Sequence, residues 1–170
     1  VEIQAPTLTE RDYRNLARIK QCGITGVMLP FVRNQEDLKN LKQALINEDA
    51  GDIRIFAKIE NQQGMEHLGE LLPHCDEIVI ARGDLGNAMP LAKLPCAQEE
   101  IADQCRKHGR AFMVVTQMLA SMEHSRVPTR AEMSDIFNAV LDGAASVMLT
   151  GETAAGQYPM PVSYTHLKLP

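Results

Sequence analysis

Short apolar runs alternate with longer, mainly polar segments along the chain, and this alternation limits the possible fold more than any other feature. The apolar runs have the length of single strands and few polar interruptions, as expected for strands covered on both faces. The segments between them carry helix caps and apolar residues at helical spacing. We therefore predict a parallel sheet covered by helices. The predicted strands are residues 26–32, 53–59, 77–81, 111–116 and 146–149, and the predicted helices are 7–21, 34–47, 64–72, 97–108 and 129–141.

Several of the predicted helices have recognisable ends. Thr7 or Thr9 can cap the first helix, and Glu10 stands at capping-box spacing from Thr7. Thr129 and Glu132 form the same T-x-x-E pattern at the start of the last predicted helix. Apolar stripes at helical spacing predict the buried faces. These stripes are Leu38, Leu41, Leu45 and Ile46 in the second helix, and Met133, Ile136, Phe137, Val140 and Leu141 in the last.

Polar residues gather where the predicted strands end, and their distribution separates two kinds of parallel sheet. A (β/α)8 barrel collects its chemistry from the carboxyl ends of many strands, whereas a doubly wound sheet concentrates it at one switch point. The pattern favours an α/β fold of the (β/α)8 TIM-barrel type. A complete barrel needs about 200 residues or more, so about five β/α units in this chain indicate an incomplete one. The strand-end residues are Arg33, Lys58, Glu60, Arg82, Asp84, Thr116, Thr150 and Glu152.

Composition excludes several classes of function. A net charge of -5 provides no basic surplus for binding a phosphate backbone, so we expect no nucleic-acid partner. No apolar run approaches the roughly 20 residues of a membrane span, and we expect no membrane partner. The four scattered cysteines form no metal or disulfide pattern and are expected to be reduced thiols, which predicts a cytoplasmic protein. These cysteines are Cys22, Cys75, Cys96 and Cys105.

Two neighbouring predicted strands each end with a pair of charged residues. The members of each pair are two positions apart in the sequence; they are Lys58 and Glu60, and Arg82 and Asp84. Residues two apart in a strand point to the same face, so Glu60 and Asp84 can both point into the mouth of the barrel. Two carboxylates without histidine or cysteine form a hard-oxygen site, suited to Mg²⁺ or Mn²⁺, with positions left for water and substrate oxygens. Lys58 can stabilise an oxyanion or a transferring phosphoryl group, and the glycines of RGDLG allow backbone N–H groups to approach an anion.

Structural interpretations of the same residues must be weighed against this site. A single charged residue at a strand end is commonly a solvated loop residue, and Lys58 with Glu60 could form an exposed ion pair of small energy. Arg82 is expected to form a structural salt bridge, because the neighbouring carboxylate of Asp84 needs charge balance. The histidines lack metal-ligand spacing, and the methionines of residues 117–122 are expected in the core. The joint pattern across several strand ends favours the functional interpretation.

Six segments resemble the pyruvate kinase family in sequence, order and spacing over roughly residues 5–159. The combination of KIEN, RGDLG, TQM and GETA is specific to that family, and the resemblance corresponds to the second part of its central barrel. Residues 1–161 are thus expected to be a partial barrel domain, and residues 162–170 are expected to be an atypical, non-helical tail that is not native to the family. The segments are AKIEN (57–61), ARGDLG (81–86), TQMLASM (116–122), PTRAE (128–132), NAVLDGA (138–144) and LTGETAAGQYP (149–159).

The resemblance implies roles for individual residues. Lys58 resembles the lysine that stabilises the transferring phosphoryl group and the enolate, and Glu60 and Asp84 resemble the ligands of the divalent metal. The backbone of Gly83 and Asp84, with Thr116, resembles the cradle for the substrate carboxylate, and Thr116 is also implied in protonation of the enolate. Arg82, Asn61 and Glu152 are implied as supporting residues of the site.

The implied reaction transfers phosphate from phosphoenolpyruvate to ADP, giving pyruvate and ATP, with Mg²⁺ and often K⁺. The resemblance also implies a homo-oligomeric parent, a tetramer. The family's first barrel strands, lid domain and C-terminal domain have no counterpart in this sequence, and the K⁺ ligands belong to those missing strands. Thr150 and Pro30 depart from the family pattern. We therefore expect the isolated chain to be inactive.

Two other functions remain open at this point. One is a metal-dependent carbon–carbon lyase or aldolase on a related phosphoenolpyruvate/pyruvate barrel, which would use the same carboxylates around an enolate. Lys58 separates the two enzymes, because phosphoryl transfer needs a cation at the site and an enolate-only lyase does not. The other is a non-catalytic fragment that acts through contacts with other subunits, since an open sheet edge favours association.

Overall fold

The five strands of the sheet are all parallel and pair in the order of the sequence, with β1 and β5 at the two edges. A doubly wound sheet reverses its strand order at a switch point, whereas a barrel keeps the order of the chain. The computed structural model, which describes residues 5–166, therefore confirms the incomplete-barrel prediction. The strands are β1 (Gly26–Leu29), β2 (Arg54–Ile59), β3 (Glu77–Ala81), β4 (Ala111–Val115) and β5 (Ser146–Met148).

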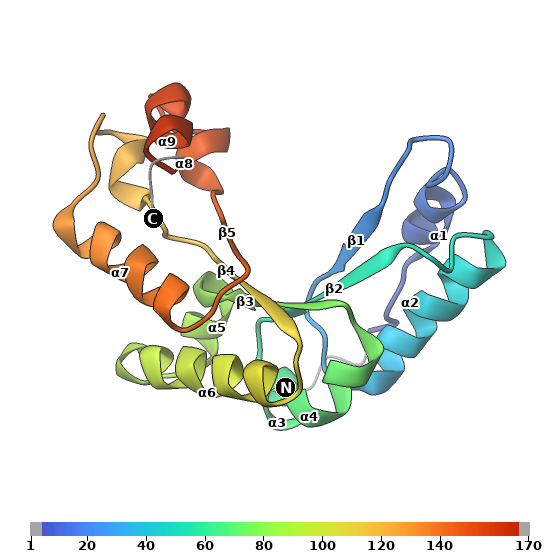
Figure 1. The fold of residues 1–170 in the computed structure, drawn as a ribbon. Helices are drawn as coiled ribbons and strands as arrows, with labels where there is room; N and C mark the ends of the chain where they lie inside the picture. Colours follow the sequence, from blue (N-terminus) through green and yellow to red (C-terminus); the bar gives the residue numbers. More distant parts are fainter. Residues whose placement is uncertain (1–4, 167–170) are drawn as a thin grey trace.

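Helices follow the strands and lie along the outer side of the curved sheet (Figure 1). The longer ones are α2 (Gln35–Asn47), α6 (Leu94–Lys107) and α7 (Arg130–Leu141). The shorter ones are α1 (Glu10–Leu16), α3 (Gln62–Glu66), α4 (Leu68–Leu71), η1 (Leu72–His74), α5 (Arg82–Ala88), η2 (Leu91–Lys93), η3 (Ala120–Glu123), α8 (Gly151–Ala154) and α9 (Pro159–His166). None of the helices within residues 5–166 is long and apolar enough to cross a membrane.

The hydrophobic core has two parts because the sheet has two faces. The larger cluster joins the strands to the covering helices and includes Leu38, Ile80 and Ile101, all fully buried. A smaller cluster on the opposite, inner face contains Val79, Ala81 and Val115. Phe56, Met113 and Met148 pack against this second cluster. Central strands buried on both faces are the reason that β3 is an uninterrupted apolar run after Glu77.

The first predicted helix and strand are both longer than the observed elements. α1 begins after Thr9, whose side chain forms a capping box with Asp12, so the expected Thr7–Glu10 box is wrong. The Thr7 hydroxyl instead donates to Asp37 Oδ1 at 2.6 Å. β1 ends at Leu29 rather than at residue 32, because Pro30 has no N–H for the ladder.

Helix predictions were accurate where caps are local and wrong where the chain turns sharply. The Thr129–Glu132 capping box of α7 is confirmed. The predicted helix 64–72 is divided at His67 into α3 and α4, and the helix α5, which contains RGDLG, was not predicted. Residues 159–166 form helix α9 with Val162 fully buried, so the non-helical prediction for the tail is wrong over residues 162–166. The predicted tail beyond residue 166 lies outside the described residues.

The two apolar stripes are only partly buried. In α7 Ile136 is buried, but Phe137, Val140 and Leu141 are 43% to 68% exposed. A helix over the last strand of the sheet contacts it through one row of residues, and Ala139 shares that row with Ile136. In α2 the leucines are buried, whereas Ile46 is 49% exposed.

Candidate functional site

The carboxyl end of β2 holds a close pair of opposite charges. Lys58 Nζ lies 2.6 Å from Glu60 Oε1, and the two side chains are 25% and 1% exposed. Lys58 pairs in register with Val79 of β3, which belongs to the inner-face cluster. The pair therefore faces the interior of the barrel, and the expectation of a fully exposed surface pair does not apply.

The other oxygen of Glu60 is held by the end of β1. Glu60 Oε2 accepts the backbone N–H of Phe31 at 2.6 Å. Phe31 follows Pro30 and has a φ of 52°, so the chain turns sharply enough to aim this N–H at the neighbouring strand. Within the described part of the chain, the buried Oε1 has no well-oriented hydrogen bond despite the nearby ammonium group. One carboxylate oxygen is thus fixed by a backbone N–H, and the other lies against the Lys58 ammonium group.

Asn61 anchors the turn that follows β2. Its Oδ1 accepts the N–H of Gly64 at 2.8 Å, and its Nδ2 donates to the Val32 carbonyl at 3.2 Å. A Cβ atom at Gly64 would lie 2.7 Å from that same carbonyl oxygen, so only glycine allows this close approach. Asn61 therefore ties the ends of β1 and β2 together beside Glu60.

Asp84 occupies a different environment at the end of β3. The strand passes directly into α5, and Asp84 lies in the first turn of this helix. Its side chain is exposed and has no hydrogen bond or ion pair to any described residue. Glu60 and Asp84 follow paired strands, since Ile59 is in register with Ile80. The free carboxylate and the buried oxygen of Glu60 are hard-oxygen donors, which fit Mg²⁺ or Mn²⁺.

Arg82 does not pair with Asp84. Its Nη1 lies 2.7 Å from Asp135 Oδ1 on α7, and its guanidinium also donates to the Thr116 carbonyl at 2.8 Å from Nη2 and 3.3 Å from Nε. Arg82 is 9% exposed and also contacts Met118 Sδ. The expected charge balance with its neighbour in sequence is thus wrong, because a carboxylate from a distant helix supplies it.

Thr116 lies at the end of β4 in the left-handed region, with a φ of 75°, and Gln117 follows at 55°. A β-branched residue in this region is strained, so its surroundings must hold it there. Arg82 binds its carbonyl, and Thr116 Oγ1 accepts the N–H of Gly83 at 2.7 Å. The hydroxyl donates to the Val115 carbonyl. The structure therefore places Thr116 and Gly83, two predicted cradle residues, in direct contact.

Glu152 lies at the base of the last strand-end turn and is 1% exposed. Its Oε1 accepts the N–H of Leu119 at 3.1 Å, and its Oε2 accepts the N–H of Thr150 at 2.9 Å. The hydroxyl of Thr150 also donates to Oε2. Glu152 thus joins the turns that follow β4 and β5, and its oxygens are occupied within the protein.

Three residues of the site were missing from the sequence interpretation. Asp135 belongs to no motif that would mark it as a site residue; the sequence indicates only that it lies on a helix. The contact made by the N–H of Phe31 could not be predicted either, since only the preceding proline indicates a turn there. Glu132 was recognised only as a helix cap, yet it also accepts the Ser121 hydroxyl and N–H at 2.6 Å each. Burial alone would raise the pKa of Glu132, but hydrogen bonds from Ser121 and Thr129 outweigh it and lower the pKa.

Among the described residues, no three or more His, Cys, Asp or Glu side chains are grouped to hold a metal ion. Glu60 and Asp84 together provide two protein carboxylates. A cation held by these two side chains has most of its coordination positions open to water and to oxygens of a bound substrate.

Comparison with known proteins gives a consistent result. Residues 1–162 match the family model described as the pyruvate kinase barrel domain. Pyruvate kinase from Bacillus licheniformis is 38% identical over 165 residues, covering 97% of this chain and 28% of that protein. Pyruvate kinase from Geobacillus stearothermophilus is 41% identical over 94% of this chain, and pyruvate kinase 2 from Saccharomyces cerevisiae is 43% identical over 94%. The chain spans 27% and 31% of these two relatives.

Proposed function

The chain belongs to the pyruvate kinase family. We therefore propose that it contributes to a site that transfers phosphate from phosphoenolpyruvate to ADP. Its part of that site binds the metal and stabilises the phosphoryl group. The observation that carries this proposal is the buried Lys58–Glu60 pair, in which Glu60 keeps one oxygen without a well-oriented hydrogen bond. Lysine and a hard-oxygen ligand side by side suit a substrate that bears both phosphate and a developing enolate.

Each residue has a separate task in this proposal. Glu60 and Asp84 would hold Mg²⁺ or Mn²⁺, and the bound cation would neutralise charge on the phosphoryl and enolate oxygens. Lys58 contributes a second positive charge, and its contact with Glu60 keeps the ammonium group at the strand end. Its removal should lower phosphoryl transfer more than it lowers metal binding.

Thr116 and Gly83 are proposed to receive the substrate carboxylate. When substrate binds, the Thr116 O–H would turn from the Val115 carbonyl to donate to one carboxylate oxygen, and the Gly83 N–H would leave Thr116 Oγ1 to donate to the other. The same hydroxyl would then stand beside the enolate carbon that must be protonated. Arg82 and Asp135 would act indirectly, by holding Thr116 in its left-handed conformation.

We further propose a cytoplasmic location and a homotetrameric parent protein whose remaining barrel strands supply the K⁺ ligands and part of the nucleotide site. The 170-residue chain alone is expected to have little or no turnover. A coupled lactate dehydrogenase assay with Mg²⁺, K⁺, phosphoenolpyruvate and ADP measures this directly. Robust activity from the isolated chain would contradict the division of the site between this chain and missing segments.

A chimera tests the catalytic roles. Residues 1–161 would replace the matching segment of the Geobacillus stearothermophilus relative, and activity would be measured with and without Lys58→Met. We expect the chimera to be active and the variant to lose at least about 100-fold in kcat, because a group that stabilises charge in the transition state is removed. Unchanged turnover in the variant would overturn the role of Lys58.

Metal binding is measured on the chain itself by electron paramagnetic resonance of Mn²⁺. Glu60→Gln and Asp84→Asn should each weaken Mn²⁺ binding by about tenfold or more, since each removes one of two anionic ligands. Asp52→Asn, an exposed carboxylate in the turn before β2, is the matched control and should leave binding unchanged. Equal effects of all three variants would indicate non-specific attraction of the cation to an acidic protein.

A further inference from the structure

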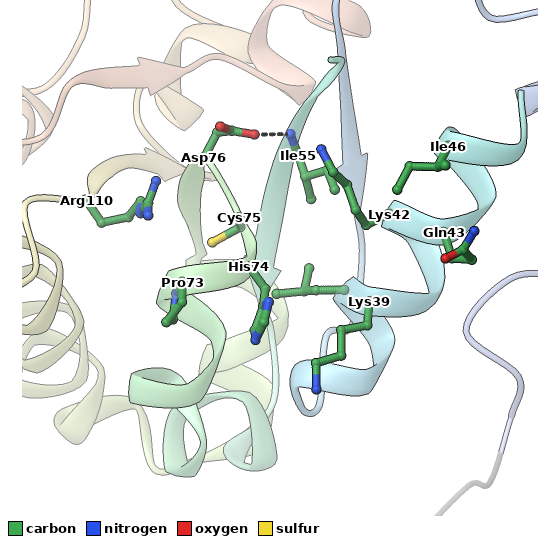
Figure 2. Close-up of a pocket in the computed structure, with 11 residues that line it drawn as sticks. Lys39, Lys42, Gln43, Ile46, Ile55, Pro73, His74, Cys75, Asp76 and Arg110 are labelled. Atoms are coloured by element: carbon green, nitrogen blue, oxygen red, sulfur yellow. Dashed lines mark hydrogen bonds between the residues drawn. The ribbon is translucent and has the colours of Figure 1, made fainter. Parts of the chain in front are cut away.

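A second pocket lies at the opposite end of the same strands. It occupies about 420 Å³ between α2 and the connection from η1 to β3 (Figure 2). Asp76 and Arg110, which line it, immediately precede β3 and β4, whereas Lys58 and Glu60 lie where β2 ends. The pocket is therefore at the amino end of the sheet, away from the proposed catalytic residues. Its volume is in the range of small-molecule sites, about 300–1,000 Å³.

Positive side chains dominate the walls of this pocket. Lys39 and Lys42 extend from α2 on one side, and Arg110 lies on the other (Figure 2). The one acidic side chain that lines it, Asp76, uses Oδ2 to accept the N–H of Ile55 at 2.7 Å. Burial raises the pKa of the Cys75 thiol to about 12, so this wall residue adds no negative charge at neutral pH. A cationic pocket in a chain of net charge -5 is a local departure from the overall charge.

These cations are weakly neutralised by the protein itself. Lys42 Nζ donates to the carbonyl of Gly51 at 2.5 Å, a neutral partner. Lys39 pairs with Glu36, but both side chains are substantially exposed, at 44% and 65%, so water screens this pair. Two of the lysine charges are thus accessible to a negatively charged ligand.

Arg110 gives the strongest indication of a ligand. Its Nε is buried and has no hydrogen-bond partner among residues 5–166, and no described carboxylate lies within ion-pair distance of its guanidinium. A buried cationic donor without an acceptor is unfavourable unless a partner arrives from outside the protein. Guanidinium groups bind phosphate and carboxylate oxygens through pairs of N–H donors.

We propose that this pocket binds a small phosphorylated metabolite, with a phosphate dianion between Arg110 and Lys42. The exposed apolar side chains of Ile46 and Pro73 also line the pocket and can contact the carbon skeleton of such a ligand, beside the polar side chains of Gln43 and His74. This contact also gives a reason for the half-exposed Ile46, which the stripe of α2 had predicted to be buried. The proposal does not depend on the phosphoryl-transfer function, because its residues are at the other end of the sheet.

The test is isothermal titration calorimetry of the 170-residue chain with inorganic pyrophosphate and with inorganic phosphate, in a buffer containing EDTA. Chelation removes divalent cations, so an anion cannot bind through a metal at Glu60 and Asp84. We expect pyrophosphate to bind at one site, more tightly than phosphate, and to weaken as salt is added. No detectable binding of either anion at low salt would overturn the proposal.

Variants locate the site. Arg110→Gln and Lys42→Gln should each raise the Kd for pyrophosphate by about tenfold, because each removes a charge-assisted contact. Lys107→Gln, an exposed lysine near the same edge of the sheet that does not line the pocket, is the matched control. Lys58→Met tests whether the anion binds at the catalytic end instead. Circular dichroism checks that each variant is folded. If Arg110→Gln unfolds, Lys42→Gln still tests the site, because Lys42 is exposed and its substitution should not affect folding.

Two results would contradict the location of the site. One is a Kd that changes by less than twofold in both pocket variants. The other is loss of binding in Lys58→Met with full binding retained in Lys42→Gln, which would assign the anion to the catalytic end. Because the chimera experiment depends on Lys58 and this titration on Arg110 and Lys42, failure of one proposal is distinguishable from failure of the other.

Discussion

The ends of β2 and β3 lie side by side, yet the protein treats their carboxylates in opposite ways. Glu60 is buried, paired with Lys58 and bound to the N–H of Phe31, whereas Asp84 is exposed and has no partner among the described residues. The difference follows from local geometry, because β2 continues into a turn tied by Asn61 while β3 passes directly into a helix. One carboxylate is therefore held in a fixed position by the protein, whereas the other is free to adjust its position.

The largest expected effect comes from breaking the pair on the β2 side. Lys58→Met should lower the free energy of unfolding by about 3 kcal/mol, at the lower end of the range for a broken buried pair, because Lys58 is a quarter exposed. Urea unfolding at pH 7 measures this change. Lys39→Met, which breaks the exposed pair with Glu36, is the control and should change stability by less than about 1 kcal/mol. Equal losses in the two variants would mean that burial of Glu60 does not matter.

A smaller effect is expected from the contact that holds Thr116. Asp135→Asn should destabilise the protein by about 2 kcal/mol, because Arg82 remains buried without its carboxylate partner. It should also increase hydrogen exchange at the Gly83 amide, which Thr116 Oγ1 accepts. Asp142→Asn, on the residue that follows α7, is the comparison. Unchanged exchange at Gly83 in Asp135→Asn would show that Thr116 keeps its conformation without the Asp135 carboxylate.

Glu132, whose carboxylate is bound within the protein, makes the stability of the fold depend on pH. Its pKa in the folded protein is below its ordinary value of 4.5, so its stabilising contribution is complete above pH 4.5 and is lost as the pH falls through the lower folded value. Glu132→Gln should cost about 1 kcal/mol at pH 7. It should also flatten the decline of stability below pH 4.5, measured by urea unfolding from pH 3 to 7. An equally steep decline in the variant would assign the acid sensitivity to other groups.

The smallest effect on stability is expected at Asp84, the exposed carboxylate that follows β3. Asp84→Asn should change the free energy of unfolding by less than about 0.5 kcal/mol in the absence of metal, because no internal contact is lost. In the presence of Mn²⁺ the wild-type chain should gain stability relative to this variant, since a ligand that binds the folded state stabilises it. Thermal unfolding with and without Mn²⁺ provides both comparisons. A large loss without metal would place Asp84 among the structural residues.

Local signals predicted the framework of the fold well. The strand Glu77–Ala81 and the Thr129–Glu132 cap depend on neighbouring residues alone, and both agree with the structure. Helix α5 was not predicted, because its two glycines weaken the helix signal of the RGDLG motif. Residues 159–166 carry prolines and β-branched residues, which disfavour a helix, yet they form α9 with Val162 buried.

The candidate site was predicted by residue type and strand end, but its internal contacts were not. Arg82 was expected to balance Asp84, its neighbour two positions away, and it pairs instead with Asp135 on α7. The N–H that fixes Glu60 belongs to Phe31, on another strand. Such contacts depend on how distant turns meet in space, which local spacing does not determine. The roles assigned to Lys58, Glu60, Asp84 and Thr116 remain predictions for the experiments above.

The sequential order of the strands has a consequence for how the protein is made. Each strand pairs with the one synthesised just before it, so every new β/α unit meets an edge that is already complete. Pairings of this kind close short loops, which favours fast folding relative to sheets that join distant segments. β2 to β5 can therefore be added on the ribosome one unit at a time, each to a partner strand that has already been synthesised.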